Sequence, residues 1–164
     1  TASFNTYSLT QAKNFALIAK SFTDEEQYNI FRGEAEVIFV SGKLYAEARY
    51  QHAHINTPGS ENAKVGGYYI QSGFLIIGDK QNYSMANGYA TNVSAGNLEL
   101  VARFGQVAYQ KNEDNETMSS DITVGLNYGI NKYMLARFNW VHGNVKDNDS
   151  SAYNAVECRL QFVF

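Results

Sequence analysis

Five arginines lie on five separate stretches of the chain, each in a segment where polar and apolar residues alternate: Arg32, Arg49, Arg103, Arg137 and Arg159. A guanidinium keeps its charge and offers several donors in one plane, which suits paired and partly enclosed positions. In the wall of a channel, rings of such groups attract anions and replace part of their hydration. Recognition of small anions is therefore the first chemistry that these residues indicate.

Glutamates accompany most of these arginines on the same strand face. The pairs are Arg32 with Glu34, Glu47 with Arg49, Glu99 with Arg103, and Glu157 with Arg159. Arg137 differs, because the residues two positions away are the uncharged Leu135 and Asn139. Nearby glutamates oppose the field of an arginine, so the set is either a selective ladder or a neutral structural network. The sequence leaves both interpretations open, and the pore-lining candidates are Arg32, Glu34, Glu47, Arg49, Glu99, Arg103, Arg137, Asn139 and Arg159.

The other reactive side chains do not predict catalysis. His52 and His54 are two residues apart on an expected strand, so they point the same way and could bind a metal, but no third ligand lies nearby in the sequence. We expect them to be polar strand-end residues, and we expect His142 to pack at an interface. Cys158, the single cysteine, is expected to act as a small hydrophobe. The sequence therefore predicts no catalytic residue, metal site, cofactor or enzymatic activity.

The residues that carry these groups alternate with period two, which is the pattern of a half-buried strand. About eight such strands are expected, over 13–22, 29–40, 43–55, 63–77, 97–105, 121–129, 132–143 and 155–164, although the first would also suit a helix. Most are near the ~9–11 residues that a tilted membrane strand needs. Twelve Tyr and ten Phe against one Pro favour long, uninterrupted strands. These features predict an all-β chain with an antiparallel meander.

The connections between the expected strands alternate in length. Tight turns are expected at 41–42 and 129–132, and longer polar loops at 55–63, 111–120 and 144–152. Short turns at one end and long loops at the other are typical of an outer-membrane barrel, with the short turns on the periplasmic side. The irregular connection over 78–96 is the exception, because it falls on the short-turn side and is far too long for a turn.

Period two alone does not say whether the apolar face meets a protein core or lipid. Two features favour lipid. The polar face carries arginine and glutamate with almost no lysine, and Tyr and Trp gather near strand ends, as in the aromatic girdles of a bilayer interface. These aromatic residues are Tyr50, Tyr109, Tyr128, Tyr133, Trp140 and Tyr153. A membrane barrel is therefore preferred to a soluble barrel that binds a ligand inside.

Composition and the two ends of the chain narrow the class further. A net charge of −3 and a pI near 5.6 do not predict the basic surface of a nucleic-acid-binding protein. The apolar runs are short, so no transmembrane helix is predicted. The first residues lack the features of a secretory signal peptide and an initiator Met, so we expect a processed or excised piece, with residues 1–164 as a single barrel segment. At the other end, an apolar strand face continues to the last residue through Leu160, Phe162 and Phe164. The frayed end of a soluble domain would gain no stability from such an exposed apolar stripe.

Four motifs together resemble the C-terminal part of the phosphate-selective porin O/P family. They are "GGYYIQSGFLIIGDKQNY" at 66–83, "AGNLELVARFGQVAY" at 95–109, "VGLNYGINKYMLARFNWVHGNV" at 124–145 and "RLQFVF" at 159–164. The resemblance covers about residues 28–164 and implies a homotrimeric, sixteen-stranded anion channel of the Gram-negative outer membrane, of which this chain is about half. It also implies that Phe164, with Phe162 and Leu160, forms a signal read by the barrel assembly machinery. The expected surroundings are outer-membrane lipid and lipopolysaccharide.

The chain departs from the family pattern in two respects. Asp79 and Gln81 stand where the family has an acidic residue and an arginine, so one basic residue is lost. The family's constriction loop and its basic cluster belong to the N-terminal half, so phosphate selectivity is not assigned to named residues here. We expect a passive porin for small solutes, with anion or phosphate preference left open. The alternative is a closed eight-stranded barrel, filled by Arg and Glu side chains, with a structural or adhesive role.

Overall fold

The structure is a computed structural model that describes residues 2–7, 16–22, 29–56, 62–84, 89–90, 93–111, 115–147 and 149–162. Every regular element in this part of the chain is a β-strand, as expected. In the same part, no helix is long and apolar enough to span a membrane.

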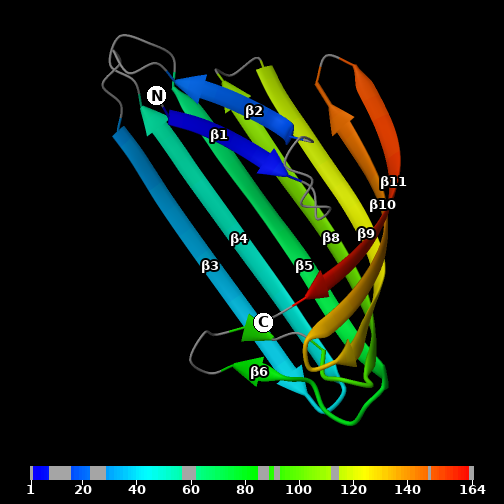
Figure 1. The fold of residues 1–164 in the computed structure, drawn as a ribbon. Helices are drawn as coiled ribbons and strands as arrows, with labels where there is room; N and C mark the ends of the chain where they lie inside the picture. The colour runs from blue at the N-terminus through cyan, green and yellow to red at the C-terminus, as the bar shows by residue number, and fades with distance from the viewer. Residues whose placement is uncertain are drawn as a thin grey trace.

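Seven long strands form one antiparallel sheet in the order β11-β10-β9-β8-β5-β4-β3 (Figure 1). They are β3 (Asn29–Ser41), β4 (Leu44–Asn56), β5 (Ala63–Ile77), β8 (Leu98–Lys111), β9 (Asn115–Asn131), β10 (Met134–Lys146) and β11 (Ser150–Phe162). Within this sheet, each strand pairs only with its neighbours in chain order, so β3 and β11 have one partner each. The antiparallel meander that the alternation predicts is confirmed.

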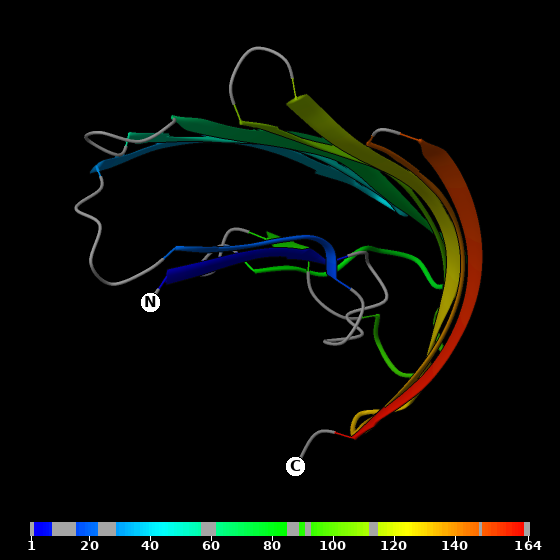
Figure 2. The same cartoon turned by 90° about the horizontal axis from the view of Figure 1, so that it is seen from above.

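Two short hairpins lie outside the main sheet. One pairs β1 (Ala2–Tyr7) with β2 (Ala16–Phe22), and the other pairs β6 (Tyr83–Ser84) with β7 (Tyr89–Ala90). Figure 2 shows both on the concave side of the curved main sheet. The strand expected over 13–22 therefore forms as β2, but it pairs with β1 and does not extend the meander.

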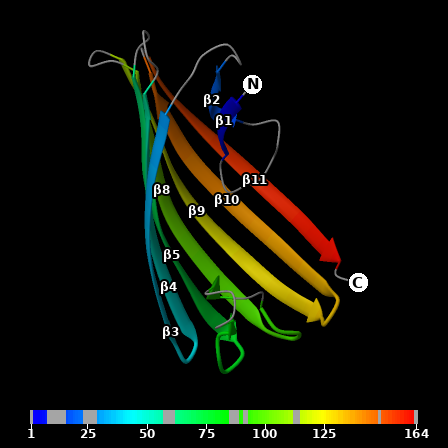
Figure 3. The same cartoon turned by 90° about the vertical axis from the view of Figure 1, so that its left-hand side faces the viewer.

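The main sheet curves as part of a barrel wall and remains open. Its strands run side by side with a common tilt (Figure 3), and β3 and β11 form its two edges without pairing with each other. This arrangement is consistent with half of a larger barrel. It is not the closed eight-stranded barrel that the sequence left as the alternative.

The two faces of the sheet have opposite compositions. Large apolar side chains on the convex face are exposed, among them Val37 at 71 %, Val156 at 65 % and Phe39 at 56 %. By strand parity, the only charged side chains on the convex face of the described main-sheet strands are Lys64, Glu116 and Lys146, all near the loop ends. The five arginines fall on the concave face. A charge-free apolar band on the outside and polar groups inside is the arrangement of a membrane barrel.

Two tight turns join strands at one end of the sheet. Gly42 has a φ of +54°, a left-handed backbone conformation that a glycine adopts without strain, between β3 and β4. Between β9 and β10 the side-chain oxygen of Asn131 accepts a hydrogen bond of 2.8 Å from the backbone N–H of Tyr133. The turn lies at Lys132 and Tyr133, slightly later than the sequence predicted, because β9 continues to Asn131.

The expected aromatic girdle is only partly correct. Tyr128 lies near the turn end on the convex face and Tyr133 is exposed in the turn itself, but parity places Tyr109 and Tyr153 on the concave face. Tyr50 and Trp140 are on the convex face midway along their strands, because β4 and β10 continue well past them toward the loops.

Aromatic side chains nevertheless mark the upper limit of the apolar band. Tyr50 lies directly opposite Tyr68, whose ring packs 6.0 Å from that of Phe104. Trp140 stacks on His142 with a centroid distance of 6.1 Å. Beyond this level the convex face becomes polar, so the strands project from the membrane on the loop side.

Val37 and Ile38 are sequence neighbours that test the assignment of the faces. Val37 is on the convex face, whereas Ile38 is on the concave face opposite Glu47. An arginine facing lipid costs about 2–4 kcal/mol near the bilayer midplane. We therefore expect Val37→Arg to lower the folded fraction after insertion into lipid, measured by heat-dependent mobility in SDS gels. Ile38→Arg should leave it nearly unchanged, and equal losses in both variants would contradict the assignment.

Candidate functional site

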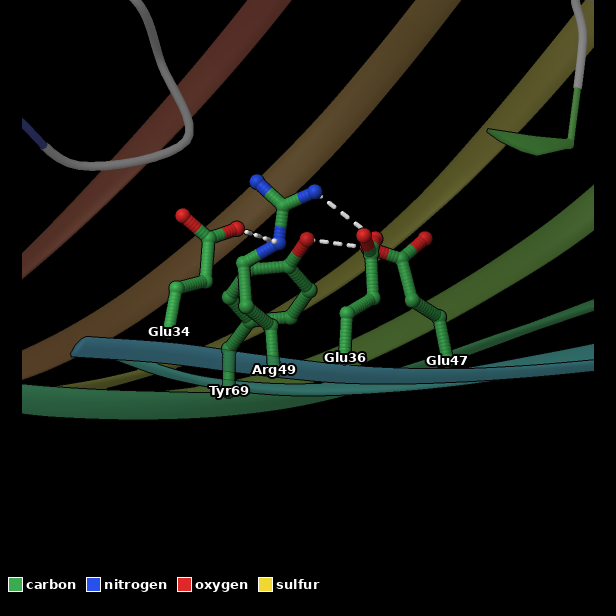
Figure 4. A network of polar contacts seen from close by, with 5 residues as sticks. All are labelled: Glu34, Glu36, Glu47, Arg49 and Tyr69. Atoms are coloured by element: carbon green, nitrogen blue, oxygen red, sulfur yellow. Dashed lines mark hydrogen bonds and ion pairs between the residues drawn. The ribbon is translucent and has the colours of Figure 1, made fainter. Parts of the chain in front are cut away.

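An ion-pair network occupies the concave face of β3, β4 and β5 (Figure 4). The Nη2 atom of Arg49 donates a hydrogen bond of 2.7 Å to Oε1 of Glu36. Its Nε lies 3.3 Å from Oε1 of Glu34, which is an ion pair without hydrogen-bond geometry. Two carboxylates of the neighbouring strand therefore surround this one guanidinium.

Tyr69 connects this network to the next strands. Its hydroxyl donates a short hydrogen bond to Oε1 of Glu47. The Arg103 guanidinium lies over the Tyr69 ring, 4.2 Å from the centroid, and that of Arg49 lies 5.9 Å from it. Cation–π attraction of this kind contributes about 0.5–1 kcal/mol at exposed sites and more where water is excluded. Tyr69 therefore joins two arginines that are far apart in the sequence.

These contacts correct the pairing expected along single strands. Glu47 was expected to neutralise Arg49, but it accepts a hydrogen bond from Tyr69, and Arg49 contacts the acids of β3 instead. Glu99 was expected to accompany Arg103, but it hydrogen-bonds other residues, described below. The physical reason is that cross-strand neighbours are closer than residues two or four positions away on one strand.

A hollow of about 500 Å³ opens on the concave face beside this network. Its lining includes Arg32, Arg49, Tyr69, Arg103 and Asp121. Gly67 and Gly105 have no side chains, so the backbone itself lines the hollow at these two positions. A Cβ atom at Gly67 would lie 2.9 Å from a backbone oxygen and 3.0 Å from the Val107 side chain. The hollow therefore brings three guanidinium groups together with two carboxylates, those of Glu34 and Asp121, and the Tyr69 ring around a depression in the wall.

A second polar cluster lies nearer the turn end, around Glu99. This side chain is only 5 % exposed. Its Oε1 accepts a hydrogen bond of 2.8 Å from the Gln81 amide, and its Oε2 accepts one of 2.8 Å from the Asn127 amide. Both carboxylate oxygens are satisfied by neutral donors, which is what a buried carboxylate requires.

Arg137 and Arg159 lie beside this second cluster. They are direct partners in the register of β10 and β11, and Asn127 is the partner of Arg137 on β9. Glu99 and Glu157 are both within electrostatic reach of Arg137. The amide of Asn139, which the sequence offered as a donor to a solute, donates to Glu157 at 3.4 Å. The structure therefore places two like charges side by side on the wall.

The connection over 78–96 begins by folding onto the concave wall. Gln81 is 4 % exposed, and its backbone N–H donates to the Gly42 carbonyl at 2.8 Å. Its amide also approaches the carbonyls of Lys43 and Gly73, at 3.3 Å and 3.4 Å. The far end of the connection is held by the 2.6 Å bond from the Gly96 N–H to the Gly129 carbonyl. The described ends of the stretch that is too long for a turn therefore lie against the concave wall.

Gln81 is the site residue that sequence reasoning missed. It was noted only as the loss of a basic residue, whereas the structure makes it the anchor of the inward segment on Glu99. The length of the connection was the signal that could have identified it. A polar residue near the start of an unusually long connection is a candidate to hold that connection in place.

The remaining predicted residues occupy separate places. Glu34 shares the hollow with Arg32. Leu160 and Phe162 are both 51 % exposed on the convex face of β11, whereas Phe164 lies outside the described residues. Cys158 is exposed. Among the residues with described side chains, no group of three His, Cys, Asp or Glu is placed to hold a metal ion.

Comparison with protein families finds a match over residues 2–164 with the family described as phosphate-selective porin O and P. The match also includes the first part of the chain, which the motifs of the sequence did not cover. No curated protein matches the chain.

The role of Gln81 as an anchor can be tested by removing its amide. A hydrogen bond to a charged group contributes about 1.5–3 kcal/mol, so Gln81→Ala should release the connection from the wall at least about tenfold more often. Trypsin applied to the reconstituted protein should then cleave after Lys80 correspondingly faster, with fragments identified by mass spectrometry. Asp79→Ala, which changes an exposed side chain, is the control. Equal cleavage rates in wild type and Gln81→Ala would contradict the anchoring role.

Proposed function

The chain belongs to the phosphate-selective porin O and P family, and from this premise we propose that it lines a passive outer-membrane channel that prefers small anions such as phosphate. Family membership and the strand-rich fold place it in the outer membrane as part of a porin barrel. The preference for anions is the proposal, and it depends on the chemistry of the concave wall.

The observation that carries the proposal is the side-by-side placement of Arg137 and Arg159. Like charges directly opposite each other in a sheet are destabilising. Such a pair is compensated when an anion approaches both groups, because two guanidinium groups can then share one oxyanion. A wall that holds this pair next to a water-filled path would concentrate anions locally.

Local placement matters because carboxylates on the same face offset the arginines. These acids are Glu34, Glu36, Glu47, Glu99, Asp121 and Glu157. Net charge therefore gives no reason for anion preference, and selectivity has to come from where the guanidinium groups are placed on the wall. Arg49, held between Glu34 and Glu36, is better explained as wall structure. Some arginines are therefore better explained as part of a selective ladder for anions, and others as part of a neutral structural network.

The proposal extends to the assembly of the protein. We propose a homotrimer on the strength of family membership, and insertion by the barrel assembly machinery through the terminal segment that ends at Phe164. The exposed Leu160 and Phe162 side chains on the outside of β11 support a lipid contact for the described part of that segment.

Selectivity measurements on matched variants test the anion preference. Removing one guanidinium at about 4 Å from a passing ion changes its energy by about 1 kcal/mol in water, or about fivefold in relative permeability. We expect Arg137→Gln to lower the anion-to-cation permeability ratio by about this factor, measured from reversal potentials in a salt gradient across a planar bilayer. Arg49→Gln should change the ratio less than about twofold, since its two glutamates already cancel its field.

Two results would contradict the proposal. One is a ratio that neither variant changes, which would make the arginines part of the wall structure only. The other is a larger effect for Arg49→Gln than for Arg137→Gln, which would reverse the assignment of roles.

A further inference from the structure

Three nitrogen-bearing side chains gather on the convex face, outside the lumen, at the loop ends of β4 and β5. His54 lies directly opposite Lys64 in the register, and His52 is two residues away on the same face. His52 has glycines on both sides, Gly33 on β3 and Gly66 on β5. These three side chains are called the outer basic cluster below.

The outer basic cluster lies just beyond the apolar band. Tyr50 and Tyr68 are the next convex-face residues toward the turn end, and they face each other across β4 and β5. The long loops, which in this class of barrel face the outside of the cell, are at the same end as the cluster. The cluster is therefore at the level where lipid headgroups of the outer leaflet meet the protein.

No acid balances the cluster on its own strands. On the convex faces of β3, β4 and β5 there is no Asp or Glu within the described residues. Glu116 is the nearest acid on this face in the register, with Gln110 of β8 between it and Lys64. Among the described residues of these three strands, Lys64 therefore supplies the charge of the convex face, with two imidazoles beside it as hydrogen-bonding groups.

The shape of the cluster leaves space for a ligand. A Cβ atom placed on Gly33 would meet no heavy atom within 4 Å, so the surface beside His52 is open there. On the other side, Nδ1 of His52 lies 3.6 Å from the position of a Cβ on Gly66, so the ring leans over that glycine. Phe31, opposite His54, is 70 % exposed and offers an apolar contact at the edge of the cluster.

One atom of the cluster lacks the partner that its position requires. Nε2 of His54 is enclosed by protein and makes no hydrogen bond in the described structure. An enclosed polar atom without a partner is costly and needs an explanation, and a bound water or ion at the site is one such explanation. A rotation of the imidazole that uncovers this nitrogen would let it donate to a phosphate oxygen, whose charge is matched by the Lys64 ammonium.

We propose that the outer basic cluster binds the phosphate of a phosphorylated glycolipid headgroup in the outer leaflet, with Lys64 supplying the charge and His52 and His54 the hydrogen bonds. The aromatic row of Tyr50 and Tyr68 below would then contact the apolar part of the same lipid. This site rests on the membrane placement of the convex face and is independent of which solute passes through the lumen.

Binding of a labelled diphosphoryl lipid A to the intact protein in detergent micelles tests the proposal. We expect Lys64→Gln to weaken the apparent affinity about fivefold, the factor associated with one basic residue near an anionic lipid surface. The double variant His52→Gln/His54→Gln should also weaken binding, and Lys64→Arg should retain it. Lys146→Gln is the matched control, because Lys146 is also on the convex face near the loops but on β10, beside Met118 and Ser150.

The readouts separate this site from the channel. Each variant is first shown to be folded by its heat-dependent mobility in SDS gels, and its reversal potential should equal that of the wild type. Equal weakening by Lys64→Gln and Lys146→Gln would overturn the proposal, because it would indicate a general surface charge effect. Equally tight binding of the same lipid without its phosphates, or full displacement of the lipid by inorganic phosphate, would also overturn it.

Discussion

The ladder of backbone hydrogen bonds between neighbouring strands is the interaction on which the rest of this structure depends. Hydrocarbon offers no water to an unpaired N–H or carbonyl, so a spanning segment has to satisfy its backbone within the protein. The register of β10 and β11 is continuous from Met134↔Phe162 to Lys146↔Ser150, which leaves no gap in that ladder. The same requirement explains why β3 and β11 cannot remain free edges in a bilayer, and why a sheet of seven strands is a wall that further strands must close.

Register also decides which solvent each side chain meets. Because side chains alternate along a strand, a slip of one residue would turn every apolar residue of that strand toward the lumen. The lumen face is built by a different rule, in which large polar side chains lie flat over glycines of the next strand. The Tyr45 ring covers Gly73, and the Tyr153 ring covers Gly143, so a side chain at either glycine would overlap a ring. These two rings fill the space beside the glycines.

The electrostatics of the two faces follow from these constraints. On the concave face, acids and arginines lie on adjacent strands, and the cross-strand neighbours of each arginine decide whether its field is cancelled or left to act on a solute. On the convex face, charge is absent from the apolar band and returns only at the loop ends. The inward connection anchored by Gln81 adds a third element, because it takes lumen space at the turn end and is held there by the buried Glu99.

The sequence by itself determined the features that depend on local periodicity. Alternation predicted the seven long strands, their antiparallel order and which residues share a face, because side-chain direction in a strand follows directly from position along the chain. The tertiary structure alone decided what depends on register between strands. Arg49 meets Glu36 rather than Glu47, and β2 pairs with β1 instead of extending the sheet. Gln81 reaches Glu99 because the chain between them folds inward, and no pattern within one strand reports a contact between residues brought together by such a fold.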